Sequence, residues 1–385
     1  MKPLAIYIHV PFCARKCAYC DFASWPGREG QWRQYCDALM TEIRQWSGMT
    51  DFGLLRDRFQ IQTVFFGGGT PTLLPSDYIR EITDRSLALA DLAPDAEITI
   101  EGNPGTLTPD KLRAYRESGV NRLSLGAQSF DDGLLRSLGR IHSASQIVEA
   151  VRMAREAGFS NINLDLMYGL PGQSMDQWLD TLDRAVALGV AHISAYSLIV
   201  EDGTPMAERV ARGEAEIPPD EAVNAMQRAA VERLAKADYG RYEISNFARP
   251  GFESRHNLTY WRRGDYLGLG CAAHSMLDDC RFSNPASLDE YLAGGRMEHF
   301  ERLTTEDILE ETVMLATRTT RGLDLNACRA RFGGVFDANN PRLAALVSAG
   351  LIEMDGDFLR LTCRGMEVQD AVVLELLDIQ EAVGR

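Results

Sequence analysis

The first 245 residues alternate between short apolar runs and longer segments with a helical pattern. We expect β-strands at the apolar runs 4–9, 63–66, 97–101, 122–126, 161–167 and 192–198. Helical patterns lie among or after them, near 77–90, 110–118, 144–157, 175–188 and 221–237. Strands separated by helices usually pair in parallel, because the helix carries the chain back across the sheet. The alternation therefore predicts an α/β fold with a parallel sheet.

Unusual polar or glycine-rich residues gather directly after five of the expected strands. A cysteine loop follows the first strand, and Gly67-Gly68-Gly69-Thr70-Pro71 follows the second. The third, fourth and fifth strands are followed by the segments 101–104, 127–129 and 168–172. Parallel α/β barrels build their active sites at this end of their strands. The pattern therefore favours a partial, TIM-like (β/α)6 barrel with a site on one rim.

Three cysteines, Cys13, Cys17 and Cys20, stand in the loop after the first strand. Three thiolates can hold three irons of a cubane [4Fe-4S] cluster and leave the fourth iron open to another ligand. A structural zinc site would require a fourth ligand nearby. The next cysteine, Cys36, falls within an expected helix at 31–46, where a buried packing role is the better interpretation.

A disulfide framework is the other alternative for these cysteines. Eight cysteines in 385 residues is ordinary usage, and the N-terminal residues do not form a secretory signal. The longest apolar stretches are strand-sized, well short of the roughly 20 residues of a membrane-spanning helix. We therefore expect a cytoplasmic protein with reduced thiols and no integral membrane segment.

The pattern changes beyond residue 245, and a second, smaller domain is expected from about residue 304. Helical patterns at 306–317 and 342–348 precede a hairpin at 351–361 with a turn at Asp355-Gly356. This order predicts an α+β, winged-helix-like domain. Residues 301–385 carry 15 acidic residues against 9 arginines and no lysine, and the whole chain has a net charge of −15. Nucleic acid is therefore excluded as an expected partner.

The sequence blocks resemble those of the radical S-adenosylmethionine (SAM) superfamily over nearly the whole chain. They are similar to the oxygen-independent coproporphyrinogen III dehydrogenases and their relatives, the HemW-type heme chaperones. The resemblance rests on the blocks that begin at Tyr7, Gly67, Glu101, Gly126 and Asp165. It implies a radical SAM partial barrel at 1–245, a connecting region at 246–303 and the winged-helix-like domain at 304–385.

The resemblance also implies roles for individual residues. Cys13, Cys17 and Cys20 would bind the [4Fe-4S] cluster, and Tyr7, Gly68 and Glu101 would contact the SAM bound to it. Positions that hold a second SAM in the dehydrogenases match Tyr19, Gly69, Thr70, Gln128, Arg140 and Asp165. Arg140 and Asp165 could equally form a buried ion pair that closes the barrel.

Two features separate the dehydrogenases from the chaperones. The dehydrogenases have a further cysteine two residues after the third cluster ligand, where this chain has Phe22. The segment His256-Asn257-Leu258-Thr259-Tyr260-Trp261 matches the His-Asn-x-x-Tyr-Trp motif that is associated with heme in the chaperones. An imidazole can ligate heme iron, and Tyr260 and Trp261 could pack on a porphyrin.

Other histidines and cysteines gave weaker signals. His274 is a second candidate heme ligand, His9 is expected to form local hydrogen bonds, and Cys271 is expected to pack in the interior. A structural histidine remains the alternative for His256.

The first hypothesis is therefore a heme chaperone that binds heme, a [4Fe-4S] cluster and SAM. It would transfer heme to acceptor hemoproteins, with respiratory hemoproteins as one class. The alternative is an enzyme of porphyrin biosynthesis, which would decarboxylate coproporphyrinogen III through radical SAM chemistry. A radical SAM enzyme that modifies tRNA ranks third, because the acidic surface and the absence of an RNA-binding pattern disfavour it.

Overall fold

The computed structural model describes residues 1–333, 336 and 340–383. Six strands form the centre of a sheet in which each strand pairs in parallel with the next one along the chain. They are β1 (Lys2–Val10), β2 (Phe59–Gly68), β3 (Asp91–Gly102), β4 (Arg122–Gln128), β5 (Asn161–Tyr168) and β6 (His192–Ser197). Every strand predicted from the sequence is present, and the predicted α/β fold with a parallel sheet is confirmed.

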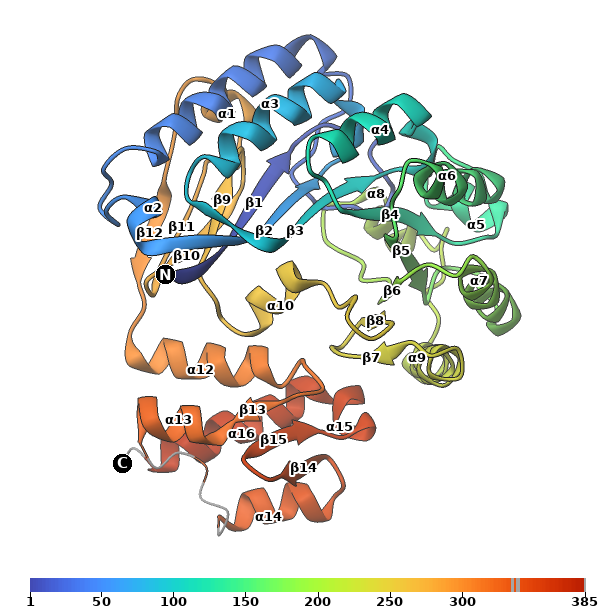
Figure 1. Ribbon diagram of the computed structural model, residues 1–385. Helices are drawn as coiled ribbons and strands as arrows, with labels where there is room; N and C mark the ends of the chain where they lie inside the picture. Colours follow the sequence, from blue (N-terminus) through green and yellow to red (C-terminus); the bar gives the residue numbers. More distant parts are fainter. Residues whose placement is uncertain (334–335, 337–339, 384–385) are drawn as a thin grey trace.

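Helices cover the outer face of this curved sheet (Figure 1). The long ones are α1 (Trp32–Trp46), α3 (Ser76–Leu87), α4 (Pro109–Glu117), α6 (Ala144–Glu156), α7 (Met175–Ala187) and α9 (Asp220–Ala235). Short helices α2 (Leu55–Arg58), α5 (Asp132–Ser137) and α8 (Pro205–Ala211) lie between them along the chain. Apolar side chains of the strands and the long helices pack into one large core.

Short strands extend the sheet at both edges. Strand β9 (Tyr266–Leu269) pairs in parallel with β1, and β10 (His274–Leu277), β11 (Cys280–Ser283) and β12 (Glu298–Arg302) follow as antiparallel neighbours. At the other edge, β8 (Asn246–Ala248) and β7 (Gly240–Arg241) follow β6. The segment 246–303, predicted as a connecting region, thus contributes strands to the main sheet, along with α10 (Arg255–Trp261) and α11 (Leu288–Leu292).

A smaller α+β unit follows the last strand of the main sheet. Its helices are α12 (Thr305–Ala316), α13 (Leu325–Phe332), α14 (Pro341–Ser348), α15 (Cys363–Glu367) and α16 (Gln369–Val383). Its sheet has the order β13 (Leu323–Asp324), β15 (Phe358–Leu361) and β14 (Ile352–Asp355), with the predicted hairpin between β14 and β15. The unit has its own apolar core. Parts of the predicted domain, at 334–335, 337–339 and 384–385, lie outside the described residues.

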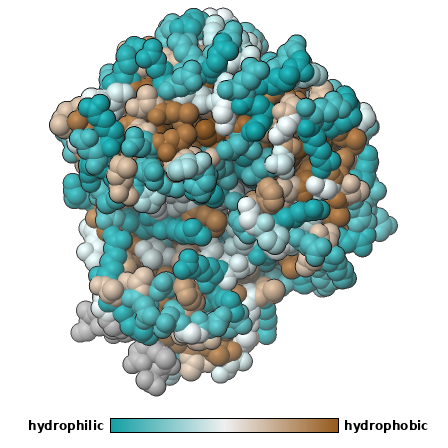
Figure 2. Space-filling view, in the orientation of Figure 1, coloured by the Kyte–Doolittle hydropathy of each residue, from teal (hydrophilic) through white to brown (hydrophobic). Residues whose placement is uncertain are grey.

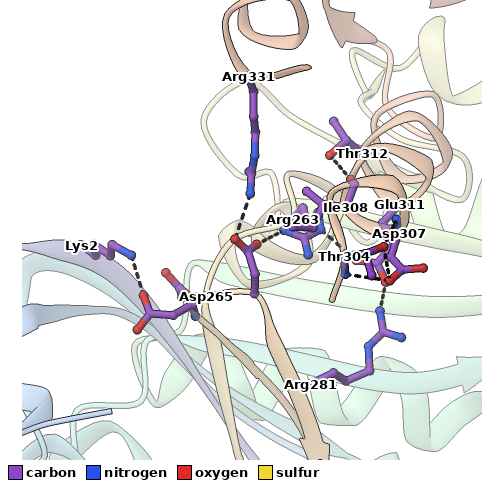
Figure 3. Close-up of polar contacts among 12 residues, drawn as sticks. Lys2, Arg263, Asp265, Arg281, Thr304, Asp307, Ile308, Glu311, Thr312 and Arg331 are labelled. Atoms are coloured by element: carbon purple, nitrogen blue, oxygen red, sulfur yellow. Dashed lines mark hydrogen bonds and ion pairs between the residues drawn. The ribbon is translucent and has the colours of Figure 1, made fainter. Parts of the chain in front are cut away.

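Helix α10 lies in the concavity of the sheet, between the barrel strands and the C-terminal unit (Figure 1). The backbone bridge Glu243–Thr319 also joins the two parts. Ion pairs connect them further: Arg263 pairs with Asp279 at 2.5 Å and with Glu311 of α12 at 2.8 Å, and Arg331 of α13 pairs with Asp279 at 2.9 Å (Figure 3). These contacts hold the C-terminal unit against the residues that follow α10 and the turn between β10 and β11.

The outer surface is polar over most of the face seen in Figure 2, as a net charge of −15 would suggest. Among the described residues, no helix combines the length and the apolar character needed to cross a membrane.

Candidate functional site

The cysteine loop lies between β1 and α1, and backbone contacts to two other segments hold it. The N–H of Cys13 donates to the Trp25 carbonyl at 3.4 Å, and the N–H of Ala18 donates to the Leu138 carbonyl at 3.0 Å. Cys13, Cys17 and Cys20 are partly exposed and are free thiols.

Two donors approach the cysteine sulfurs, one from the turn after β2 and one from the loop after α5. Thr70 Oγ1 lies 3.7 Å from Cys13 Sγ, and Arg140 Nη1 lies 3.3 Å from Cys17 Sγ. Among the described residues, no group of three or more His, Cys, Asp or Glu side chains converges to hold a single metal ion. In a cubane cluster each thiolate binds a different iron, so its ligands surround a volume and do not meet at one point.

The turn after β2 packs directly against the cysteine loop. The N–H groups of Gly69 and Thr70 donate to the carbonyls of Val10 and Phe12, at 2.8 and 2.7 Å. A Cβ atom at Gly69 would lie 2.5 Å from the Phe12 carbonyl oxygen. Only glycine therefore permits this approach, which fixes the position of the three cysteines relative to β2.

A cavity of about 350 Å³, here named the cysteine cavity, opens beside this loop. It brings together eleven of the residues predicted for cluster and SAM binding: Cys13, Cys17, Tyr19, Cys20, Gly68, Gly69, Thr70, Glu101, Gln128, Arg140 and Asp165. They come from strands β2 to β5 and from the connections that follow β1, β2 and β4, and they are far apart in the sequence. Three thiols on one wall, with carboxylates, backbone amides and an arginine on the others, fit a cubane cluster together with a polar, zwitterionic ligand.

The carboxylates of Glu101 and Asp165 lie deep in this cavity. Burial and the nearby Asp165 raise the pKa of Glu101 to about 8, against the Gly68 backbone N–H and Arg122, which both lower it. Burial also raises the pKa of Asp165, against hydrogen bonds from neighbouring side chains. A ligand that donates hydrogen bonds or carries positive charge would relieve this cost of burying two carboxylates.

Arg140 and Asp165 do not form the buried ion pair that was one of the two alternatives for these residues. Arg140 Nη2 donates to the Gly126 carbonyl at 2.6 Å, and its Nη1 faces Cys17. Asp165 instead accepts from Ser124 Oγ at 3.0 Å and from Asn163 Nδ2 at 2.9 Å. Arg140 Nε is buried without a partner among the described residues. Both side chains thus remain available to a ligand in the cavity.

A second cavity, here named the barrel cavity, holds about 250 Å³ between the inner face of α10 and the strands. Tyr7, His256 and Tyr260 line it, and Gly68, Glu101 and Asp165 belong to both cavities. His256 Nδ1 is 2.8 Å from Thr63 Oγ1, and its Nε2 is 2.8 Å from the Tyr260 hydroxyl. Both ring nitrogens therefore have partners within the protein.

The three predicted heme residues do not share one cavity. Trp261 lines a separate groove between α10 and the C-terminal unit, whereas His256 and Tyr260 face the barrel cavity. His274, the second candidate, is exposed at the start of β10 and lines neither cavity nor the groove. The helical turn explains the division, because successive positions 260 and 261 point about 100° apart.

Four residues with weaker signals occupy the places that their types suggest. His9 contacts the Tyr7 hydroxyl at 3.0 Å and the Ala23 carbonyl at 2.8 Å, as expected for a locally bonded histidine. Cys36 and Cys271 are buried. Phe22 is 61% exposed at the edge of both cavities, where the dehydrogenases have a cysteine.

Several cavity residues were missed in the sequence. Arg122 and Ser124 on β4, Asn163 on β5, and Ser194 and Tyr196 on β6 all line the barrel cavity. Strands buried on both faces read as continuous apolar runs, whereas these strands carry polar residues at every second position. This alternation is the signal for an interior that is open to ligands.

Comparisons with known proteins identify the families that this chain resembles. Residues 7–185 match the family model "Radical SAM superfamily", and residues 303–368 match "HemN C-terminal domain". The chain is 38% identical to heme chaperone HemW of Mycobacterium tuberculosis, over 98% of this chain and 95% of that protein. It is 40% identical to heme chaperone HemW of Escherichia coli, over 72% and 71% of the two chains.

A solved structure also matches nearly the whole chain. Coproporphyrinogen III oxidase (HemN) from Escherichia coli, a radical SAM enzyme, superposes with a TM-score of 0.82 at 26% identity. The match covers 98% of this chain and 90% of that chain. It supports the same order of barrel and C-terminal unit.

Proposed function

Because the chain belongs to the heme chaperone HemW family of the radical SAM superfamily, we propose that it binds heme and transfers it to acceptor hemoproteins. The observation that carries the proposal is 38% identity to a heme chaperone over 98% of the chain. Radical SAM proteins use a [4Fe-4S] cluster and SAM, and the cysteine cavity has the donor set for both. The acceptors and a cytoplasmic location are part of the proposal.

Cys13, Cys17 and Cys20 would hold the cluster, which supplies an open iron and a source of electrons. Tyr7, Gly68 and Glu101 would bind the SAM that occupies the open coordination position of this iron. Support comes from the position of Glu101 in the cavity, where its buried carboxyl group could accept hydrogen bonds from ribose hydroxyls. Such hydrogen bonds would lower its raised pKa and offset the cost of its burial. Tyr19, Gly69, Thr70, Gln128, Arg140 and Asp165 line the same cavity and would hold a second SAM or another polar ligand.

Helix α10 would be the heme-binding element. Of its motif residues, Trp261 faces outward into a groove, where its ring can pack against a porphyrin. His256 would support the heme site through the helix, because its contact with Thr63 fixes α10 to β2, and Tyr260 holds the His256 ring from within the helix. Direct ligation of iron by His256 would require the bond to Thr63 or to Tyr260 to break.

The test is an anaerobic experiment on the full chain after cluster reconstitution. Heme is titrated and followed by its Soret absorption. For transfer, the heme-loaded protein is mixed with an apo-hemoprotein, the two are separated by size-exclusion chromatography, and the heme in each fraction is measured. We expect about one heme per chain and transfer faster than from free heme. The Cys13→Ala/Cys17→Ala/Cys20→Ala variant should lose iron and sulfide, which separates the role of the cluster from heme binding.

Coproporphyrinogen III, added with SAM and a strong reductant, is the matched test of the alternative. The 26% identical oxidase structure favours that activity, and the exposed Phe22 in place of a cysteine disfavours it. We expect coproporphyrinogen to remain intact under conditions in which SAM is cleaved. Multiple turnovers to protoporphyrinogen, or the absence of stoichiometric heme binding, would contradict the chaperone proposal.

A further inference from the structure

A third cavity lies on the side of α10 that faces away from the barrel cavity. It holds about 650 Å³ between α10 and the C-terminal unit, and we name it the interdomain groove. Leu258 and Trp261 of α10 form one wall, and residues of α12, α13 and β15 form the other. Its volume falls within the range of roughly 300–1,000 Å³ that is typical of cofactor sites.

Aromatic rings and arginines alternate along this groove. Trp261, Phe332 and Phe358 line it. The guanidinium of Arg318 lies over the Trp261 ring at 5.2 Å, and that of Arg321 lies over the Phe358 ring at 5.0 Å. Flat rings bordered by cations suit a ligand that is itself flat, apolar and edged with negative charge.

Three arginines at the groove have guanidinium N–H groups that are not used in ion pairs. Among the described residues, Arg262 and Arg321 have no acidic group within 4.0 Å, although the chain is strongly acidic overall. Burial lowers the pKa of Arg262, and the positive charge of Arg321 lowers it further. Arg263 uses Nε and Nη1 in its two ion pairs, while its Nη2 is buried without a partner in the described part of the chain (Figure 3).

The acidic residues of the groove do not neutralise these arginines. Asp324 accepts the Ala327 N–H at 2.9 Å and thereby caps α13, and Glu253 forms no ion pair among the described residues. Asp279 and Glu311 pair with Arg263, and Arg331 also binds Asp279. Two uncompensated arginines beside each other indicate a site for two carboxylates or for one dianion.

We propose that the interdomain groove is the heme site, with the macrocycle against Trp261 and the two propionates on Arg262 and Arg321. The inference rests on the proposed chaperone function and specifies which side of α10 carries the heme. Among the described lining residues there is no histidine. Recognition is therefore through the ring and the carboxylates, and metal-free protoporphyrin should bind nearly as well as heme.

The test compares Arg262→Gln/Arg321→Gln with the control Arg329→Gln/Arg364→Gln. All four arginines are exposed, and neither control position lines the groove. Heme, protoporphyrin and heme dimethyl ester, in which both propionates are blocked, are titrated against the full-length proteins. Loss of two charge-assisted hydrogen bonds should weaken heme and protoporphyrin binding at least about tenfold, with no change in the control. The ester should bind wild type and the double variant equally.

The outcomes separate this inference from the proposed function. If wild type binds one heme and the double variant binds it with equal affinity, the groove is not the site and the chaperone proposal stands. Loss of heme binding in His256→Gln, together with failure of wild type to bind protoporphyrin, would assign the heme to the inner side of α10. If wild type binds no heme, the proposed function itself fails. Circular dichroism of each variant reports whether the fold is retained.

Discussion

His256 is held on both sides of its ring inside the barrel, by Thr63 and by Tyr260. It also stacks on Phe65, with ring centroids 4.9 Å apart. Burial, together with the positive charge of Arg122, lowers the pKa of His256 to about 3. A histidine in this environment stays neutral, so its first contribution is to hold α10 against β2.

The pKa of His256 predicts how stability depends on pH. Unfolded histidine titrates near 6.5, so between pH 6.5 and about 3 the unfolded chain takes up a proton that the folded chain refuses. The contribution of His256 to stability is present above pH 6.5 and is lost as the pH falls. In His256→Gln, the difference in unfolding free energy from wild type should shrink by about 1.4 kcal/mol per pH unit below 6.5.

Urea denaturation of both proteins at pH 7.5, 6.0 and 5.0 measures this difference. His299→Gln, which removes an exposed histidine, is the matched control. A stability difference for His256→Gln that stays constant over this range would mean that the ring is already protonated or solvated in the folded protein.

The position of a residue at the cavity could be predicted where one short sequence block contained both the end of a strand and a side chain with a recognisable chemical role. The cysteines, Gly69 and Glu101 belong to this class, and the structure brings them to one cavity. The direction of side chains on α10 was not predictable, because His256 and Trp261 are both large, ring-bearing residues of one motif. Only the packing of the helix against β2 determines which of them faces inward.

At the scale of elements, the contact between the cysteine loop and the turn after β2 fixes the geometry of the cysteine cavity. In Gly69→Ala, the added methyl would meet the carbonyl oxygens of Phe12 and Val10 at 2.5 and 2.8 Å. These are backbone atoms, so the loop itself must move. We expect a loss of stability of about 1–3 kcal/mol and a lower yield of iron and sulfide per chain after reconstitution.

Gly30→Ala is the control for this variant, because a Cβ at Gly30 meets no atom within 4 Å. Iron and sulfide analysis and urea denaturation are performed on both proteins. Equal cluster content and equal stability in the two variants would show that the turn does not set the position of the cysteines.

The long elements could be predicted and the short ones could not. Strands β1 to β6 have apolar residues in runs or at every second position, and the major helices have amphipathic patterns. Strands β8 to β12 are three to five residues long and carry charged or polar residues, as in β12, all of whose residues are exposed. Their pairing depends on the edges that β1 and β6 offer, which local sequence does not encode.

At the scale of the whole molecule, a small ion-pair network joins the barrel to the C-terminal unit. The side chain of Arg263 is only 5% exposed and pairs with both Asp279 and Glu311. Arg263→Ala should destabilise the protein by about 3 kcal/mol, because it leaves two partly buried carboxylates with fewer partners. Arg281 and Arg331 retain one pair each, which limits the loss.

Calorimetry and limited proteolysis measure the effect of this substitution. We expect the single unfolding transition of wild type to broaden or divide, and cleavage to increase between β12 and α12. Arg360→Ala, which removes exposed pairs within one hairpin, should cost less than about 1 kcal/mol. Unchanged cleavage in Arg263→Ala would mean that the Glu243–Thr319 bridge and apolar contacts suffice to hold the units together.

Helix α10 is a partition with a different cavity on each side: His256 and Tyr260 face the chamber that shares Glu101 with the cysteine cavity, and Trp261 faces the interdomain groove. A ligand that shifts the helix from one side therefore changes the free energy of binding in the cavity on the other side. Thermodynamic linkage makes this exchange reciprocal, so the factor by which SAM changes the affinity for heme equals the factor by which heme changes the affinity for SAM. With SAM and heme bound as proposed, one seven-residue helix would let the occupancy of the first chamber control when cargo leaves the second.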